Sequence, residues 1–215
     1  MPIVGTGSSQ GKTVRWKTAG TSLVSGSTYT LGVSTFTNDV IVFAYTNAGA
    51  PTLTSSTTGI TWTQYKTTGG SSPQPTMLIG VGATAGITSI VVSGTANLGG
   101  GYCLAVISGR SASPVIATSQ AVWTSAFTGG TTGSLNLSSS VSPLVVGATA
   151  EYGAGTPTSV TSTTGFAQIQ AFWNTGRSVA LFTIEEPTSP SAQQTTVVWP
   201  TLNAGGALVA GLARG

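Results

Sequence analysis

The hydrophobic residues of this chain come in short runs, either alternating with polar residues or standing together over several positions. Tyr29, Leu31 and Val33 alternate with small or polar residues, which is the period-two pattern of a strand with one buried face. Residues 40–45 are continuously apolar, as expected for a strand that is covered on both faces. No stretch shows the 3.6-residue period of an amphipathic helix, so the pattern predicts an all-β protein.

Twelve runs of this kind are predicted as strands, and they fall into two sets of six. Clusters of Gly, Pro, Asn and Ser separate the runs and predict turns, for example at residues 47–51 and 153–157. The first set covers residues 28–36, 39–46, 60–67, 76–83, 88–93 and 101–108, and the second covers residues 133–138, 144–150, 165–172, 177–184, 194–199 and 207–213.

The two sets belong to an internal duplication. Residues 89–109 align with residues 195–215 without a gap, and the identical positions in the first block are Val91, Val92, Thr95, Asn97, Gly99, Gly100 and Gly109. The duplication predicts a jelly-roll-like β-sandwich built from two pseudo-repeats, at about residues 24–109 and 128–215.

One sandwich domain over residues 21–215 and two small sandwiches in tandem both fit this duplication. The stretch that joins the halves, residues 111–130, holds five large apolar residues, namely Val115, Ile116, Val122, Trp123 and Phe127. A solvated linker between domains does not need such residues. We therefore favour a single sandwich.

Residues 1–20 differ from the rest and are predicted as a short N-terminal arm. They hold Lys12, Arg15 and Lys17, which are three of the seven basic residues, together with Trp16. One interpretation is a surface strand or frayed terminus whose basic side chains are solvated. The other is an arm that contacts a neighbouring subunit or a capsid through these four residues, with Trp16 as its anchor, because aromatic and Arg side chains dominate interface energetics.

The composition argues against catalysis. The chain has no His, one Cys, seven Lys or Arg and four Asp or Glu. Without His, most hydrolytic triads and nearly all zinc sites are excluded, so we expect no enzymatic activity, no metal and no cofactor. Cys103 stands alone in an apolar run, where a thiol is usually a small buried hydrophobic group.

The motifs that resemble catalytic sites are incomplete. Gly11, Lys12 and Thr13 match the end of a phosphate-binding loop, but the first glycine of that motif is replaced by Thr6. Glu185 and its neighbour Glu186 point to opposite faces of a strand. A glycosidase pair would need a partner such as Glu151 or Asp39, and the spacing does not bring these residues together.

Charge and hydropathy limit the partners. The net charge is +3 and only 5% of residues are charged, so the chain lacks the broad basic surface that nucleic acid requires. No apolar stretch reaches the roughly 18 residues of a membrane span, and no signal peptide is visible. We expect assembly in a cytoplasm, without membrane association. A weakly charged surface also favours self-association.

The order of these runs resembles the Gly/Ser/Thr-rich β-sandwich modules of tailed-bacteriophage virion proteins. The resemblance covers roughly residues 24–215. It depends on the apolar run 39–46, the Gly-Ile-Thr-Trp-Thr segment 59–63, and the runs 76–82, 89–93 and 101–109. The second half departs from it, because residues 166–169 read Phe-Ala-Gln-Ile in place of the Ile-Thr-Trp-Thr segment.

This resemblance implies a structural role in a virion. It favours a capsid decoration or cement protein that is assembled in the host cytoplasm, forms a homo-oligomer, with a trimer expected, and bridges subunits of the major capsid protein. The alternative is a carbohydrate-binding receptor module of a tail or head fibre. Its sugar platform would come from exposed tryptophans among Trp62, Trp123, Trp173 and Trp199, although core packing is the commoner role of such residues.

Overall fold

The chain folds into antiparallel β-sheets. The computed structural model describes residues 14–21, 25–47, 52–68, 74–94, 100–131, 144–151, 159–162, 167–174, 177–185 and 195–214. These segments form fourteen strands and, among the residues described, no helix. The predicted all-β, sandwich-like fold is therefore confirmed, whereas its jelly-roll-like character and the predicted domain boundaries stay predictions.

The strands form three sheets. Sheet A has the order β1 (Val14–Thr21), β8 (Gly101–Ile107), β3 (Val40–Asn47), β6 (Gln74–Val81) and β5 (Thr61–Lys66). Sheet B has the order β2 (Ser27–Thr30), β7 (Ser89–Gly94) and β4 (Leu53–Ser55). Sheet C has the order β11 (Ser159–Ser162), β14 (Thr195–Arg214), β10 (Leu144–Glu151), β13 (Arg177–Glu185) and β12 (Ala167–Asn174), and β9 (Arg110–Thr131) also pairs with β14.

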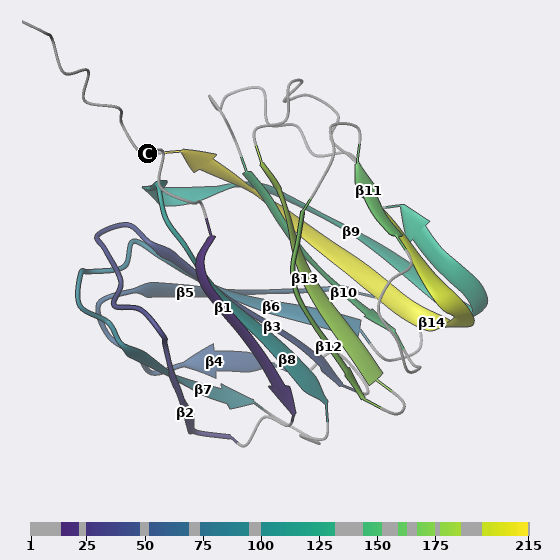
Figure 1. The fold of residues 1–215 in the computed structure, drawn as a ribbon, viewed down its shortest axis with the longest axis horizontal. Coiled ribbons are helices and arrows are strands. Elements are labelled where there is room, and N and C mark those ends of the chain that lie inside the picture. The colour runs from purple at the N-terminus through teal and green to yellow at the C-terminus, as the bar shows by residue number, and fades with distance from the viewer. Residues whose placement is uncertain are drawn as a thin grey trace, which may run out of the picture.

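Sheet A is the middle layer of the molecule. Figure 1 shows it between the small sheet B and the larger sheet C. Consecutive residues of β3 alternate between two hydrophobic cores: Val42 faces the core shared with sheet C, and Phe43 faces the core shared with sheet B. Every residue from Val40 to Tyr45 is fully buried, which confirms that this apolar run is covered on both faces.

Sheets A and C repeat one topology. Sheet A reads β1-β8-β3-β6-β5, and the corresponding strands of sheet C read β9-β14-β10-β13-β12. In sheet C the two long strands β9 and β14 make two pairings with each other. The first part of β9 pairs with the end of β14, and the last part of β9 pairs with the beginning of β14. In the first half of the chain the equivalent pairings are made by four separate strands, β1 with β8 and β2 with β7.

The strand pairing makes residues of the two halves equivalent in a way that differs by one position from the ungapped sequence alignment. Ala44 pairs with Cys103 in sheet A, and Ala148 pairs with Leu208 in sheet C. The alignment instead matches Cys103 with Val209. A slip of one residue would turn the apolar set of β14 away from the core it shares with sheet A, and the observed register places Leu208 in that core.

Two strands extend beyond the runs predicted from the sequence. The joining stretch 111–130 lies within β9, and β14 joins residues 195–199 of one predicted run to the whole of the run 207–213. The two long strands pair with each other over much of their length. The joining stretch is therefore part of sheet C, and its Val115 packs against the core between sheets A and C.

Leu181→Ala tests the core between sheets A and C. Leu181 is fully buried there, and removing a buried Leu side chain lowers the free energy of unfolding by about 2–5 kcal/mol. Urea denaturation followed by far-UV circular dichroism measures the change. The exposed control Thr28→Val should stay within about 0.5 kcal/mol of the unsubstituted protein. A stable protein with an unchanged midpoint for Leu181→Ala would contradict the assignment of this core.

Candidate functional site

Arg15 is partly buried and makes its contacts within the chain. It donates hydrogen bonds from Nη1 to Oδ2 of Asp39 and from Nη2 to the backbone oxygen of Ser34, the latter at 3.1 Å. Its guanidinium lies 3.6 Å from the ring centroid of Phe36. Asp39 is 1% exposed and also accepts a hydrogen bond from the backbone N–H of Phe36 at 2.8 Å. The ion pair therefore fixes the loop after β2 to the edge strand β1.

Trp16 is also engaged within the chain. It is half-buried and packs against the core between sheets A and B. A Cβ on Gly32 would lie 2.0 Å from Nε1 of Trp16, closer than any side chain tolerates. Glycine at this position therefore lets the indole lie against the loop. Trp16 anchors β1 to its own sheet.

The four predicted contact residues thus differ in their surroundings. Arg15 and Trp16 make contacts inside the chain, Lys17 is exposed on β1, and Lys12 lies outside the described residues. The described part of the predicted arm is an edge strand of sheet A paired with β8, as in the surface-strand interpretation. Contact of these residues with a neighbouring subunit or capsid stays a prediction.

The opposite edge of sheet A carries two grooves, one on each side of β5. The first, which we call the β4–β5 groove, is a cavity of about 550 Å³ where sheets A and B are open toward solvent. It is lined by Thr52, Leu53, Thr54 and Ser55 from β4 and its approach, by Trp62, Gln64 and Lys66 from β5, and by Leu78 from β6.

Trp62, Gln64 and Lys66 share one face of β5 because they occupy alternate positions. Trp62 is half-buried, and its Nε1 donates to the backbone oxygen of Thr57 at 3.3 Å. The side-chain oxygen of Gln64 accepts a hydrogen bond from the backbone N–H of Leu53. This bond connects the edge of sheet A to the edge of sheet B across the groove.

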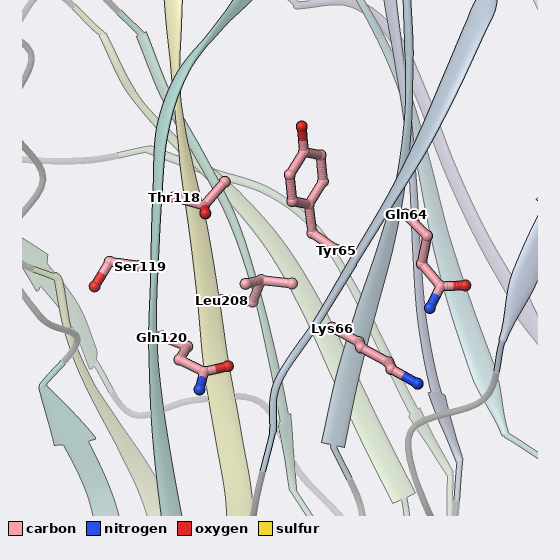
Figure 2. Close-up of a pocket in the computed structure, with 7 residues that line it drawn as sticks. All are labelled: Gln64, Tyr65, Lys66, Thr118, Ser119, Gln120 and Leu208. Carbon is pink, nitrogen blue, oxygen red and sulfur yellow. The ribbon is translucent and has the colours of Figure 1, made fainter.

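The second groove, the β5–β9 groove, lies between the edges of sheets A and C and has a volume of about 330 Å³. Figure 2 shows the residues that line it, with Tyr65 on the side of Thr118 and Leu208. Gln64 and Lys66 extend away from these three, and they line both this groove and the β4–β5 groove. Burial raises the pKa of Tyr65, and its hydrogen bond with Thr63 partly opposes this effect. The phenol therefore stays neutral well above physiological pH.

Gln120 closes one end of the β5–β9 groove. Its side-chain oxygen accepts a hydrogen bond from the backbone N–H of Thr68 at 3.0 Å, and its Nε2 donates to Oγ1 of Thr68 at 2.9 Å. Both bonds tie β9 to Thr68, the second residue after β5. Both polar atoms of the Gln120 side chain are thus hydrogen-bonded within the protein. The β4–β5 groove is therefore the better candidate for a ligand.

The strand register keeps Glu151 and Glu185 apart. In the antiparallel pair of β10 and β13, Glu151 lies opposite Ser178 and Glu185 lies opposite Leu144. The two glutamates are at opposite ends of the pair, about 24 Å apart along the strand, whereas such pairs lie roughly 5–9.5 Å apart. Asp39 is occupied by Arg15.

The structure describes no metal-ligand cluster among the residues it covers, and it places the single thiol in the core. No group of three or more His, Cys, Asp or Glu residues is placed there to hold a metal ion. Cys103 is fully buried, as its apolar context predicts, and its Sγ lies 3.6 Å from the backbone oxygen of Val179. No helix of the described segments is long and apolar enough to cross a membrane.

Of the tryptophans predicted as a sugar platform, the structure describes the side chain of Trp62. Trp62 lines the β4–β5 groove, and it also packs against the core between sheets A and B with Ile60. The side chains of Trp123, Trp173 and Trp199 lie outside the described ones. No protein-family model, curated protein or solved structure matches this chain.

Arg15→Met tests the internal ion pair. The substitution leaves the buried Asp39 carboxylate without its cation, so the free energy of unfolding should fall by about 3 kcal/mol, the low end for breaking a buried pair, because Arg15 keeps some solvent contact. The double variant Arg15→Met/Asp39→Asn should regain part of this loss, since no buried charge remains. Chemical denaturation measures both.

Lys17→Met is the matched control for Arg15→Met, because Lys17 lies on the same strand and is exposed. Its effect should stay within about 0.5 kcal/mol. If Arg15→Met were no more destabilising than this control, the pair would not fix the loop to β1.

Proposed function

We propose that the chain is a non-enzymatic structural protein of a virion, which decorates the capsid and bridges subunits of the major capsid protein. The observation that carries the proposal is the three-layer stack, in which one sheet is buried on both faces by the other two. Such a stack resists deformation, because its layers are joined by two close-packed apolar cores and the strands within each sheet by backbone hydrogen bonds.

The chemistry of the described residues suits a structural role in a particle. Stability comes from apolar packing and backbone pairing, which depend little on salt or pH. The ion pair of Arg15 with Asp39 fixes a loop. Arg110 is buried at the start of β9 and donates to the backbone oxygens of Ser108 and Leu212. Both arginines act in holding strands together.

Self-association and capsid contact belong to the same proposal. We assign them to the N-terminal segment with Lys12 and to the exposed Lys17 on β1, at the opposite edge of sheet A from the β4–β5 groove. A homotrimer fits the threefold positions of an icosahedral shell, and cyclic symmetry lets one patch serve each subunit. Many weak contacts repeated over the shell would have to break together under internal pressure.

Removal of residues 1–13 tests the proposal while leaving β1 in place. The full chain is mixed with heads that lack it, and its copies per particle are counted by quantitative mass spectrometry. We expect it to bind in numbers comparable with the shell subunits. The shortened chain should keep its thermal unfolding midpoint but form fewer oligomers and decorate heads poorly, because it has lost part of the contact segment.

The copy number separates the proposed role from that of a fibre module, which occurs in far fewer copies. Full-length protein that stays monomeric and fails to bind heads would contradict the proposal. If the shortened chain oligomerised and decorated heads as well as the full chain, the N-terminal segment would not be a contact segment.

A further inference from the structure

We infer that the β4–β5 groove binds an oligosaccharide that carries carboxylate groups. This inference goes beyond the proposed role on a capsid, because it concerns a ligand of the module's own surface. A cavity of about 550 Å³ falls within the range of small-molecule sites, which run from about 300 to 1,000 Å³.

Trp62 supplies a fixed aromatic surface in the groove. A Cβ on Gly80 would lie 2.8 Å from Cζ3 of Trp62 and 2.5 Å from Cδ1 of Ile60, so the glycine lets both side chains lie flat against sheet A. The bond from Nε1 to the backbone oxygen of Thr57 holds the indole in this orientation. A sugar ring that packs its C–H face on an ordered indole loses little rotamer entropy at the protein.

Gln64 supplies a positioned hydrogen-bond donor next to this surface. Its oxygen is occupied by the backbone N–H of Leu53, which fixes which end of the amide faces the groove. The Nε2 group makes no hydrogen bond to the described residues and is not among their buried unpartnered atoms. It is therefore available to the hydroxyl or ring oxygens of a saccharide, beside the exposed hydroxyls of Thr52 and Thr54.

Lys66 gives the groove its charge. It is exposed, it is the one charged residue among those lining the groove, and no ion pair joins it to a described carboxylate. A cation in an otherwise neutral groove favours a ligand with a carboxylate, because charge-assisted hydrogen bonds are about twice as strong as neutral ones.

The spacing of the three side chains sets the ligand's size. Alternate residues of a strand are about 6.8 Å apart, so Trp62, Gln64 and Lys66 form a row of about 14 Å. This row is longer than one sugar ring. The ligand is accordingly an oligosaccharide with one ring on Trp62 and a carboxylate near Lys66, from either uronic or sialic acid units.

Isothermal titration of the full chain tests the site with three probes, namely oligogalacturonate, oligosialic acid and, as the neutral counterpart, dextran oligosaccharides. At least one carboxylated probe should bind, and at least about tenfold more tightly than dextran, since a hydrogen bond to a charged group contributes about 1.5–3 kcal/mol. Comparing the two carboxylated probes shows whether the site prefers uronic acid units or sialic acid units. Affinity should fall as salt concentration rises.

Two substitutions test the site, and Trp62→Leu assigns it to the β4–β5 groove, because Lys66 lines both grooves whereas Trp62 lines this one and not the β5–β9 groove. Lys66→Gln should raise Kd about tenfold for the carboxylated probe and leave the fold intact, because Lys66 is exposed. Trp62→Leu keeps an apolar contact with Ile60 but removes the flat indole, and should also raise Kd about tenfold. Lys17→Gln, at the other edge of sheet A, is the matched control and should leave saccharide affinity unchanged.

Binding of none of the probes, equal binding of dextran, or unchanged affinity in Lys66→Gln would each overturn the inference. Because Lys66→Gln is expected to fold normally, the test stands even if Trp62→Leu is unstable. Head binding by Lys66→Gln, measured alongside, is expected to match that of the unsubstituted chain. The saccharide site and the capsid role can therefore fail separately.

Discussion

The burial of sheet A on both faces is the constraint on which the rest of the structure depends. An inner strand of such a sheet has no solvent side, which is why residues 40–45 of β3 are all apolar. Odd and even positions then serve different cores, one shared with sheet B and one shared with sheet C. A change of register in sheet A would disturb both cores together.

This arrangement also determines where the molecule can interact. The interior strands of sheet A are covered, so its free surface is at the two edges, β1 and β5. At β1 the Arg15–Asp39 pair and the Trp16 indole hold the edge against the body of the protein. At β5 the edges of sheets B and C do not cover the strand completely, so a groove lies on each side of it. The candidate sites are thus consequences of how three layers meet.

Much of the fold could be predicted because period-two alternation and continuous apolar runs report directly on the faces of a strand. The burial of residues 40–45 and of Cys103 followed from such local patterns. The extent of β9 and β14 did not, because Gly and Pro within them predict turns when tertiary pairing is unknown. The one-residue difference between the aligned and the structurally equivalent positions of the two halves could not be predicted either. Identical residues in an ungapped alignment of glycine-rich segments carry no information about which face of a strand is buried.

The candidate site was harder to predict, for a physical reason. Arg15 and Asp39 are 24 positions apart, and only the pairing of β1 with β8 brings them together. The groove depends on which strand edges remain open, and that is a property of the sheet order. Trp62 was visible from the sequence as a core or a sugar-platform residue, and the structure gives it both a core contact and a place in the groove.

The central claim is that the layers form one rigid unit with sheet A in the middle, and native-state hydrogen exchange tests it most directly. The account predicts that the amides of β3 and β8 in sheet A, and of β10 and β13 in sheet C, open with the free energy of global unfolding. Exchange from sheet C at a clearly lower free energy, with sheet A still protected, would contradict it, because the two sheets would then unfold separately.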